Sequence, residues 1–179
     1  SFFARTHLDE NGKPSRGRKY IGLLSNMVGL QTLQVKVYAT LLQKVTEFEE
    51  KERDPFWTLL SFYNSIRELG GSLTLFQTDI PSYFLQLKNK HHIKDKHFQR
   101  YLNSFKELTS RLDSGEVSEA IQILKRSYEE KMPVDVCLAS NIIEVGVDID
   151  RLSLMSVIGQ PKNTAQYIQV TGRIGRKWF

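Results

Sequence analysis

Apolar and polar residues follow one another along the chain with spacings that predict both helices and strands. Over residues 31–51 apolar positions recur every three or four residues, the spacing of an amphipathic helix; they are Leu33, Val37, Leu41, Leu42, Val45 and Phe48. The charged run at 47–53 predicts that this helix ends in solvent, and Asp54-Pro55 breaks the pattern. A short apolar run at residues 20–24 predicts a strand before the helix.

Four further strands are predicted, at residues 56–63, 105–110, 134–139 and 152–158. The runs at 56–63 and 152–158 are short and mostly apolar, which is typical of strands covered on both faces of a sheet. Because parallel sheets carry helices on both faces, such runs favour a parallel arrangement over a half-exposed antiparallel one.

Helices are predicted between these strands. One begins at residue 66 and is expected to stop at Gly70-Gly71. Asp113 and Glu116 stand in the reciprocal positions of a capping box, so a second helix should follow them and end at Met132-Pro133. Thr164 is expected to cap a last helix that reaches about Arg173.

The alternation of strands and helices indicates an α/β fold with a mostly parallel sheet. We divide the chain into an N-terminal strand-and-helix extension, residues 1–55, and a main domain, residues 56–179. Residues at about 72–105 read as a partly helical elaboration, with helices expected at 81–87 and 98–105.

Composition excludes several classes of protein. With 179 residues, 40% of them hydrophobic, the chain can build a core, and its apolar runs are too short to span a bilayer. Its single cysteine, Cys137, excludes an intrachain disulfide and a cysteine zinc cluster, and its mid-strand place predicts an inert core thiol. No metal site is expected, because His91, His92 and His97 read as a solvated basic loop.

A net charge of +5 mildly favours a polyanionic partner. The aromatic residues near position 60 are expected to be core residues and not a base-stacking platform. We expect a cytoplasmic protein without membrane contact, in a reducing compartment. The first residues, Ser1-Phe2-Phe3, lack an initiator Met and predict a chain cut from something longer.

The segment 139–150 follows a predicted strand, where ligands bind in open α/β sheets. Ser140 offers a hydroxyl and a backbone N–H to a phosphate, and Gly146 permits close backbone approach. Asp148 could accept hydrogen bonds from a sugar hydroxyl. The alternative is a strand, a turn and a capping Asp without a ligand.

The segment 166–176 closes the last predicted helix with two arginines three residues apart, Arg173 and Arg176, each preceded by glycine. The guanidinium group is permanently charged and has a fixed donor fork, which suits phosphate oxygens. The alternative is a basic helix end that complements the helix dipole.

Taken together, residues 134–176 closely resemble motifs V and VI of superfamily 2 helicases. The positions in register are Pro161, Tyr167, Gln169, Gly172, Arg173, Gly175 and Arg176. Residues 57–67 resemble the motif IV strand and its following turn. The opening residues and the stretches 59–71 and 107–111 are also similar to the large helicases of DISARM-type phage-defence systems.

The resemblance implies the second, RecA-like lobe of a two-lobe motor, with a three-layer sandwich truncated after motif VI. In that family Arg173 and Arg176 would be arginine fingers. The nucleotide would meet Gly146, Asp148 and Gln169. The nucleic-acid backbone would meet Asn64, Ser65, Arg67, Ser140 and Asn141.

The chain has no Gly-x-x-x-x-Gly-Lys-Ser/Thr motif and no Asp-Glu-x-His or Asp-Glu-Ala-Asp box. The resemblance therefore implies that ATP and Mg²⁺ are held mainly by an N-terminal RecA-like lobe absent from this chain, which would be inactive alone. Its partners would be that lobe and a nucleic acid, with DNA favoured over RNA through the narrower resemblance.

Two positions depart from the motifs. Val170 stands where many relatives have a basic residue, which implies one fewer phosphate contact, and Asn141 replaces the commoner Asp. Two functions remain open: a motor lobe of a helicase or translocase, and a degenerate lobe that binds nucleic acid or a partner without ATP turnover.

Overall fold

The computed structural model describes residues 8–13, 17–95, 98–130, 132–140 and 149–175. Among these residues four parallel strands form one sheet in the order β2-β3-β1-β4. The strands are β1 (Leu59–Tyr63), β2 (Phe105–Leu108), β3 (Val136–Ala139) and β4 (Leu154–Ile158). The predicted α/β class and parallel sheet are confirmed.

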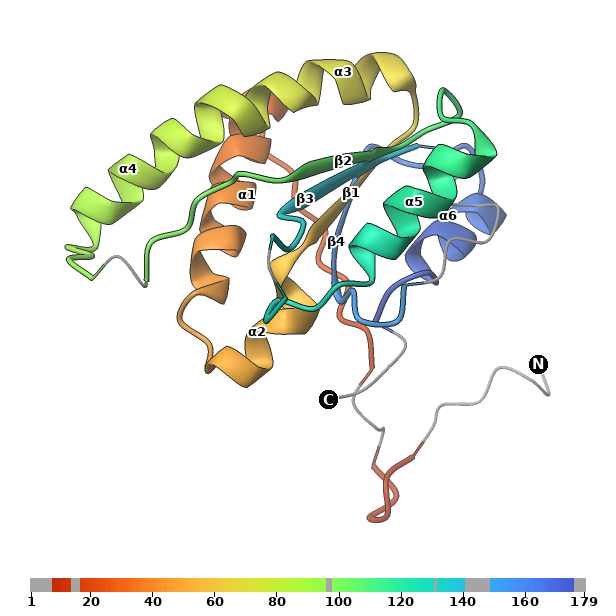
Figure 1. Cartoon of the computed structure of the whole chain (residues 1–179), viewed down its shortest axis with the longest axis horizontal. Helices are drawn as coiled ribbons and strands as arrows, with labels where there is room; N and C mark the ends of the chain where they lie inside the picture. The colour runs from red at the N-terminus through yellow and green to blue at the C-terminus, as the bar shows by residue number, and fades with distance from the viewer. Residues whose placement is uncertain (1–7, 14–16, 96–97, 131, 141–148, 176–179) are drawn as a thin grey trace.

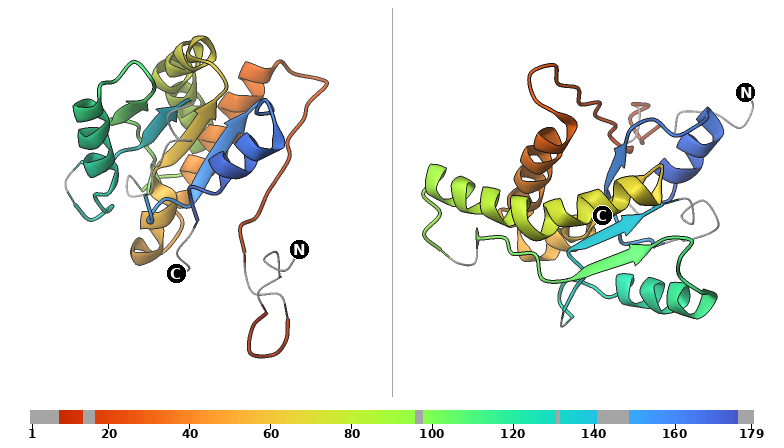
Figure 2. Two further views of the ribbon diagram at one scale, coloured as in Figure 1. Left: turned by 90° about the vertical axis from the view of Figure 1, so that its right-hand side faces the viewer. Right: turned by 90° about the horizontal axis from the view of Figure 1, so that it is seen from above.

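Helices cover both faces of the sheet, which gives three layers (Figures 1 and 2). One face carries α1 (Leu30–Val45), α3 (Ile66–Thr74) and α4 (Ile80–Lys90), and the other carries α5 (Ser114–Leu124) and α6 (Thr164–Thr171). The short helix α2 (Glu50–Trp57) leads into β1. None of the described helices is both long and apolar enough to cross a membrane.

Each face of the sheet has its own core, because side chains alternate along a strand. In β1, Leu59 and Tyr63 pack toward α1, α3 and α4, whereas Leu60 and Phe62 pack toward α5 and α6. All five residues of β1 are buried. A central strand buried on both faces must be apolar throughout, which explains the continuous run in the sequence.

A group of buried hydroxyls attaches α1 to the sheet. The Tyr38 hydroxyl lies 3.1 Å from Ser61 Oγ on β1 and 2.8 Å from Ser156 Oγ on β4. Burial raises the pKa of Tyr38 well above its ordinary value, so this hydroxyl stays protonated. Since buried polar groups must be bonded, these contacts fix where α1 lies across β1 and β4.

Two predicted helix breaks are wrong. Pro55 does not break the chain but lies inside α2, where it is buried and its carbonyl accepts a hydrogen bond from Ser153 N at 2.8 Å. Gly70-Gly71 does not stop α3, which continues through a π-helical turn, η1 (Leu75–Asp79), into α4. Packing of the apolar face overrides the low helix propensity of glycine here; its buried residues are Leu69, Leu75, Phe76 and Ile80.

The segments 20–24 and 98–105 also differ from their predictions. Residues 20–24 form no strand and are exposed. Residues 98–104 are largely irregular, and β2 begins only at residue 105. Three backbone N–H groups of this stretch, those of Arg100, Asn103 and Ser104, donate to side chains. Asn103 N and Ser104 N both donate to Asp135 Oδ2, at 2.7 and 2.9 Å. The helix expected at 81–87 is present as α4, and the capping box of Asp113 and Glu116 is confirmed.

Buried arginines fix the amino ends of the strands. Arg100 is 1% exposed, pairs with Asp135 at 2.9 Å and lies over the Trp57 ring at 3.3 Å. Burial lowers the pKa of the Arg100 guanidinium to about 10, against the opposing effect of Asp135. Arg100 Nη2 also donates to Trp57 O at 3.0 Å. This pair joins the segments that precede β1, β2 and β3.

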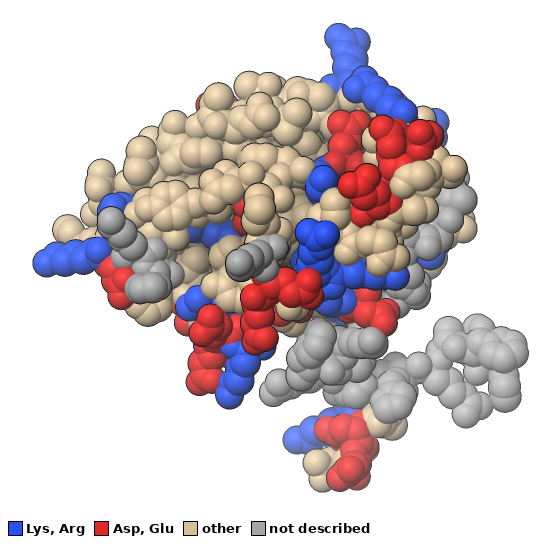
Figure 3. Space-filling model, in the orientation of Figure 1, with Lys and Arg blue, Asp and Glu red and all other residues tan. Residues whose placement is uncertain are grey.

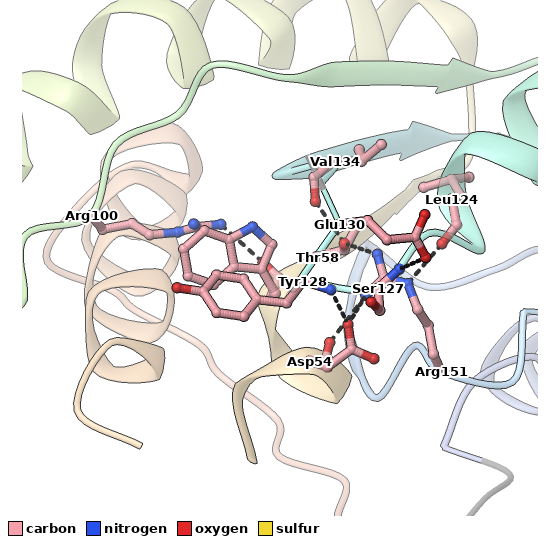
Figure 4. A network of polar contacts seen from close by, with 10 residues as sticks. Asp54, Thr58, Arg100, Leu124, Ser127, Tyr128, Glu130, Val134 and Arg151 are labelled. Carbon is pink, nitrogen blue, oxygen red and sulfur yellow. Dashed lines mark hydrogen bonds and ion pairs between the residues drawn. The ribbon is translucent and has the colours of Figure 1, made fainter. Parts of the chain in front are cut away.

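Arg151 does the same for β4, as Figure 4 shows. Its guanidinium donates to Leu124 O at 2.8 Å, to Thr58 Oγ1 at 2.8 Å and to Asp54, whose Oδ1 lies 3.2 Å away. Thr58 Oγ1 in turn donates to Val134 O at 2.6 Å. Together the two arginines connect the amino ends of all four described strands.

Removing the partner of a buried charge should destabilise the fold strongly. We expect Asp135→Asn to lower the free energy of unfolding of the 179-residue chain by about 3–5 kcal/mol, because Arg100 is left buried without an opposite charge. Urea denaturation would measure this. Glu47→Gln, which removes the exposed ion pair with Lys44, is the matched control and should change stability little. Equal effects of the two changes would contradict the assignment.

Candidate nucleic-acid and nucleotide interfaces

The predicted site residues that the structure describes fall into two groups, near opposite ends of β4. Residues 64–67 and Ser140 follow β1 and β3 at the carboxyl edge of the sheet. Arg173 follows α6, which starts at that edge after β4 and runs back toward the amino edge, where Gly175 N donates to Leu152 O at 2.8 Å. Five residues of β4 separate the two edges by roughly 13 Å. Only the first group lies where a ligand is expected from sheet topology alone.

Asn64 connects two strand ends at the carboxyl edge. Its side-chain Nδ2 donates to Ile158 O at 3.0 Å and to Gln160 O at 3.2 Å. Gly159, between those two carbonyls, has φ +70°, and a Cβ there would lie 3.2 Å from Asn64 Nδ2. The amide group of Asn64, a residue predicted to contact nucleic acid, therefore holds the turn after β4, and its nitrogen already has two carbonyl acceptors.

Ser65 and Arg67 lie beside it, at the start of α3. Ser65 is the N-cap residue, and its hydroxyl accepts a hydrogen bond from Glu68 N at 3.3 Å. Both Ser65 and Arg67 are exposed. A capped helix N-terminus with an exposed arginine in its first turn combines backbone N–H groups, a favourable dipole and a positive charge, all of which suit a phosphate.

Ser140 ends β3 at the same edge but is 2% exposed. Its backbone N–H donates to Leu108 O at 3.1 Å, so it does not offer that group to a phosphate as the sequence suggested. The other predicted residues of this segment, Asn141, Gly146 and Asp148, lie outside the described residues, as does Arg176.

Arg173 stands in a short loop after α6, residues 172–175, which we call the finger loop. Val170 and Ile174 on either side of it are buried in the core shared with β1, β3 and α5. Val170 is fully buried, so its side chain packs in the core and offers no contact to a phosphate. Gly175, with φ +62°, adopts a conformation that favours glycine. The loop thus has fixed ends around Arg173, while Gln169 is exposed on α6.

The N-terminal segment crosses this loop, a contact that the sequence did not suggest. Arg18 Nε donates to Ile174 O at 2.7 Å, and Arg18 Nη2 lies 3.4 Å from Gly172 O. The ring of Tyr20 lies 6.4 Å from that of Tyr167 on α6. Figure 2 (left) shows the segment descending beside α6. Nothing in the sequence distinguishes Arg18 from the other basic residues near the N-terminus.

Other candidate residues belong to the core. Trp57 lies 4.2 Å from Tyr128, centroid to centroid, and Phe62 and Tyr63 are fully buried, so the core interpretation holds for them. Phe56 is 37% exposed. Cys137 is fully buried, and burial raises the pKa of its thiol well above the usual range, which fits an inert thiol. Among the described residues no three His, Cys, Asp or Glu side chains gather as a metal site.

On the one face drawn in Figure 3, the described residues form no large patch of a single charge. Basic and acidic side chains are intermixed on the face drawn in Figure 3, and the area over α4 is largely uncharged. A depression of about 400 Å³ lies between the C-terminal halves of α1 and α4, away from the carboxyl edge. Its lining includes Gln43, Leu87 and Phe98. The site residues named from the sequence stay a prediction.

Comparison with known proteins identifies the class. Residues 71–177 match the family model described as "Helicase conserved C-terminal domain", more than half of the chain. The chain belongs to this family, and the resemblance to superfamily 2 helicases is confirmed. With its three layers and parallel sheet, the chain is the expected RecA-like lobe.

A particular relative is the DISARM protein DrmA of Bacillus paralicheniformis, which is 39% identical over 182 residues. The aligned part covers 98% of this chain but only 16% of DrmA, so the chain spans less than a fifth of that relative. A solved structure of S. cerevisiae Dbp5 bound to RNA and ADP BeF3 is 16% identical, with a TM-score of 0.46 over 82% of this chain and 30% of that one.

The turn after β4 should be sensitive to a single methyl group. We expect Gly159→Ala to destabilise the 179-residue chain by about 1–2 kcal/mol, because alanine is strained at φ +70° and its Cβ would press on the Asn64 amide. Urea denaturation would measure the change. Gly70→Ala in α3, where a Cβ meets nothing within 4 Å, is the matched control and should stabilise. A neutral Gly159→Ala would show that the turn does not need this conformation.

Proposed function

We propose that this chain is the C-terminal motor lobe of an ATP-dependent nucleic-acid helicase or translocase. The observation that carries the proposal is the finger loop of a chain that belongs to the helicase C-terminal family. Arg173 in this loop is partly exposed to solvent, and it stands between two buried residues, Val170 and Ile174. A loop fixed on both sides presents its arginine in one place, as transition-state stabilisation requires. A lobe that served only as a binding module would have no need of paired arginines.

On the nucleotide side, Arg173 and Arg176 would reach ATP bound by an N-terminal lobe, with Gln169, Gly146 and Asp148 near the nucleotide. Guanidinium groups suit the charge on a transferring phosphoryl group, and arginine fingers are worth about 10³–10⁵ in rate. These donors fit phosphate oxygens and not Mg²⁺. We therefore assign Mg²⁺ to the N-terminal lobe, where it would neutralise charge on the phosphates.

On the nucleic-acid side, the carboxyl edge would bind the sugar-phosphate backbone of DNA. Of the described residues predicted to bind there, Ser65 and Arg67 are exposed, whereas Ser140 is buried; Asn141 comes next in the sequence. Asn64 would act indirectly, because its amide nitrogen holds the turn after β4. Backbone contacts read no base edges, so binding should have little sequence preference and should weaken steeply with salt.

The two candidate interfaces lie at opposite edges of the sheet, and this arrangement suits a motor that couples ATP hydrolysis to movement along a nucleic-acid strand. Closure of the two lobes on ATP would bring the arginines to the γ-phosphate, and hydrolysis would release them. Because both edges belong to one rigid sheet, movement at the nucleotide would carry the carboxyl edge with it. If both lobes hold one strand, repeated closure advances the protein along it.

Replacement of Arg173 or Arg176 should reduce ATP hydrolysis without weakening DNA binding. In the full-length protein we expect Arg173→Ala and Arg176→Ala each to lower DNA-stimulated ATP hydrolysis by about 100-fold or more, because the phosphoryl charge loses its partner. Steady-state ATPase assays and DNA binding would be measured together. Arg126→Ala removes an exposed arginine near the end of α5 and serves as the control.

Unchanged turnover in the Arg173 and Arg176 variants would contradict the arginine-finger assignment. Absence of ATP hydrolysis by the folded wild-type protein with single-stranded DNA, double-stranded DNA and RNA would favour a degenerate binding lobe instead. Stimulation by RNA alone would contradict the choice of DNA.

DNA binding at the carboxyl edge should depend on Arg67. We expect Arg67→Ala to weaken DNA binding several-fold for any sequence and to reduce the slope of log Kd against log salt by about 1, because one phosphate contact is lost. Fluorescence anisotropy over a salt series would measure this. The same Arg126→Ala variant is the control, and an unchanged slope for Arg67→Ala would place the DNA elsewhere.

A further inference from the structure

Arg18 bonds to the two carbonyls that flank the peptide of Arg173. Its Nε–H donates to Ile174 O at 2.7 Å, and its Nη2 lies 3.4 Å from Gly172 O. The first contact is short, as expected for a donor that carries charge. Both donors belong to one planar guanidinium, so their spacing is fixed. The two carbonyls they meet are therefore held at a set separation, with Arg173 between them.

The finger loop needs such a restraint. It contains Gly172 and Gly175, and glycine is the residue that loses most conformational freedom when a chain is ordered. The hydrogen bond from Gly175 N to Leu152 O holds one end, and burial of Ile174 holds the centre. Gly172 is the C-cap of α6, where carbonyls lack partners within the helix. Arg18 supplies donors to that end of the loop.

The position of Arg18 is itself defined by this contact. The residues that follow it pack little: Ile21 is 68% exposed and Leu24 is 91% exposed. The aliphatic part of Arg18 lies against Gly175, where a Cβ would be 3.5 Å from Arg18 Cγ. The segment thus lies beside α6 through Arg18 and the Tyr20–Tyr167 contact, and not through burial of its apolar side chains.

We infer that Arg18 is a positioning residue for the arginine finger Arg173, acting through the backbone of the finger loop. The inference rests on the proposed function, since Arg173 must touch the nucleotide for its position to matter. Arg18 itself touches no reacting atom. It sets the backbone on both sides of Arg173, and a misplacement of about 1 Å at a catalytic group can cost about 100-fold in rate.

The test uses the full-length protein and distinguishes an effect on the position of Arg173 from an effect on the binding of ATP or DNA. We expect Arg18→Ala to lower kcat of DNA-stimulated ATP hydrolysis by about 10-fold to 100-fold, with KM for ATP and the Kd for DNA within about twofold of wild type. Arg18→Lys keeps the charge but not the fork and should recover only part of kcat. Lys19→Ala, one residue away and exposed, removes the same charge and should leave kcat unchanged.

Hydrogen exchange gives a second readout that does not depend on catalysis. Arg18→Ala should speed amide exchange in a peptide that covers residues 172–175 and leave a peptide covering β1 unchanged. A merely structural role would instead lower the melting temperature and change exchange in both peptides.

The Arg173→Ala variant, measured in the same series, distinguishes failure of the positioning role of Arg18 from failure of the proposed function. If Arg173→Ala abolishes turnover while Arg18→Ala keeps wild-type kcat, the proposed function stands and the positioning role is wrong. If Arg173→Ala keeps wild-type turnover, the proposed function fails and the inference fails with it. Unchanged exchange at 172–175 in Arg18→Ala, or equal losses of kcat and DNA binding, would also overturn the inference.

Discussion

The arrangement of both candidate interfaces depends on the parallel pairing of β1 with β3 and β4. The registers pair Phe62 with Ala139 and Tyr63 with Ile158, so the three strands end at one level. Residues nearly 100 positions apart in the sequence thereby become neighbours, and the Asn64 amide joins the end of β1 to the turn after β4. A shift of register by one residue would reverse the faces of each strand and break both cores.

The same strand, β4, connects the carboxyl edge to the finger loop. Arg151 precedes β4 and is bonded to Leu124, Thr58 and Asp54. The next residue, Leu152, is fully buried, and its carbonyl accepts the hydrogen bond from Gly175 N. The buried polar network at the amino edge therefore has a second consequence besides stability: it fixes the residue on which the finger loop rests. Breaking a hydrogen bond of a buried polar network costs much free energy, so this network holds Leu152 in place under the finger loop.

The sequence predicted the elements whose causes are local. Four of the predicted strands are present as β1 to β4, and the capping box of Asp113 and Glu116 begins α5. Local signals failed where tertiary packing decides: α2 contains Pro55, and α3 passes through Gly70-Gly71. The motif spacing located Arg173 and the residues after β1 and β3. It could not show that the Asn64 amide and the Ser140 N–H are already bonded, since those partners, in residues 158–160 and 108, are set by the fold.

Arg18 belongs to this last class and shows why a motif is not a complete site. The match to the helicase C-terminal family covers residues 71–177, so it contains the finger loop but not the residue that bonds across it. Two glycines, Gly172 and Gly175, give the backbone around Arg173 more conformational freedom than other residues would. Besides the core contacts of the loop, a restraint comes from a segment about 155 positions earlier, through hydrogen bonds to carbonyls and not to side chains. Backbone acceptors are present whatever residues occupy the loop, so no sequence pattern within the motif records the contact. The backbone geometry around Arg173 thus depends on two distant parts of the chain, of which only one lies within the family match.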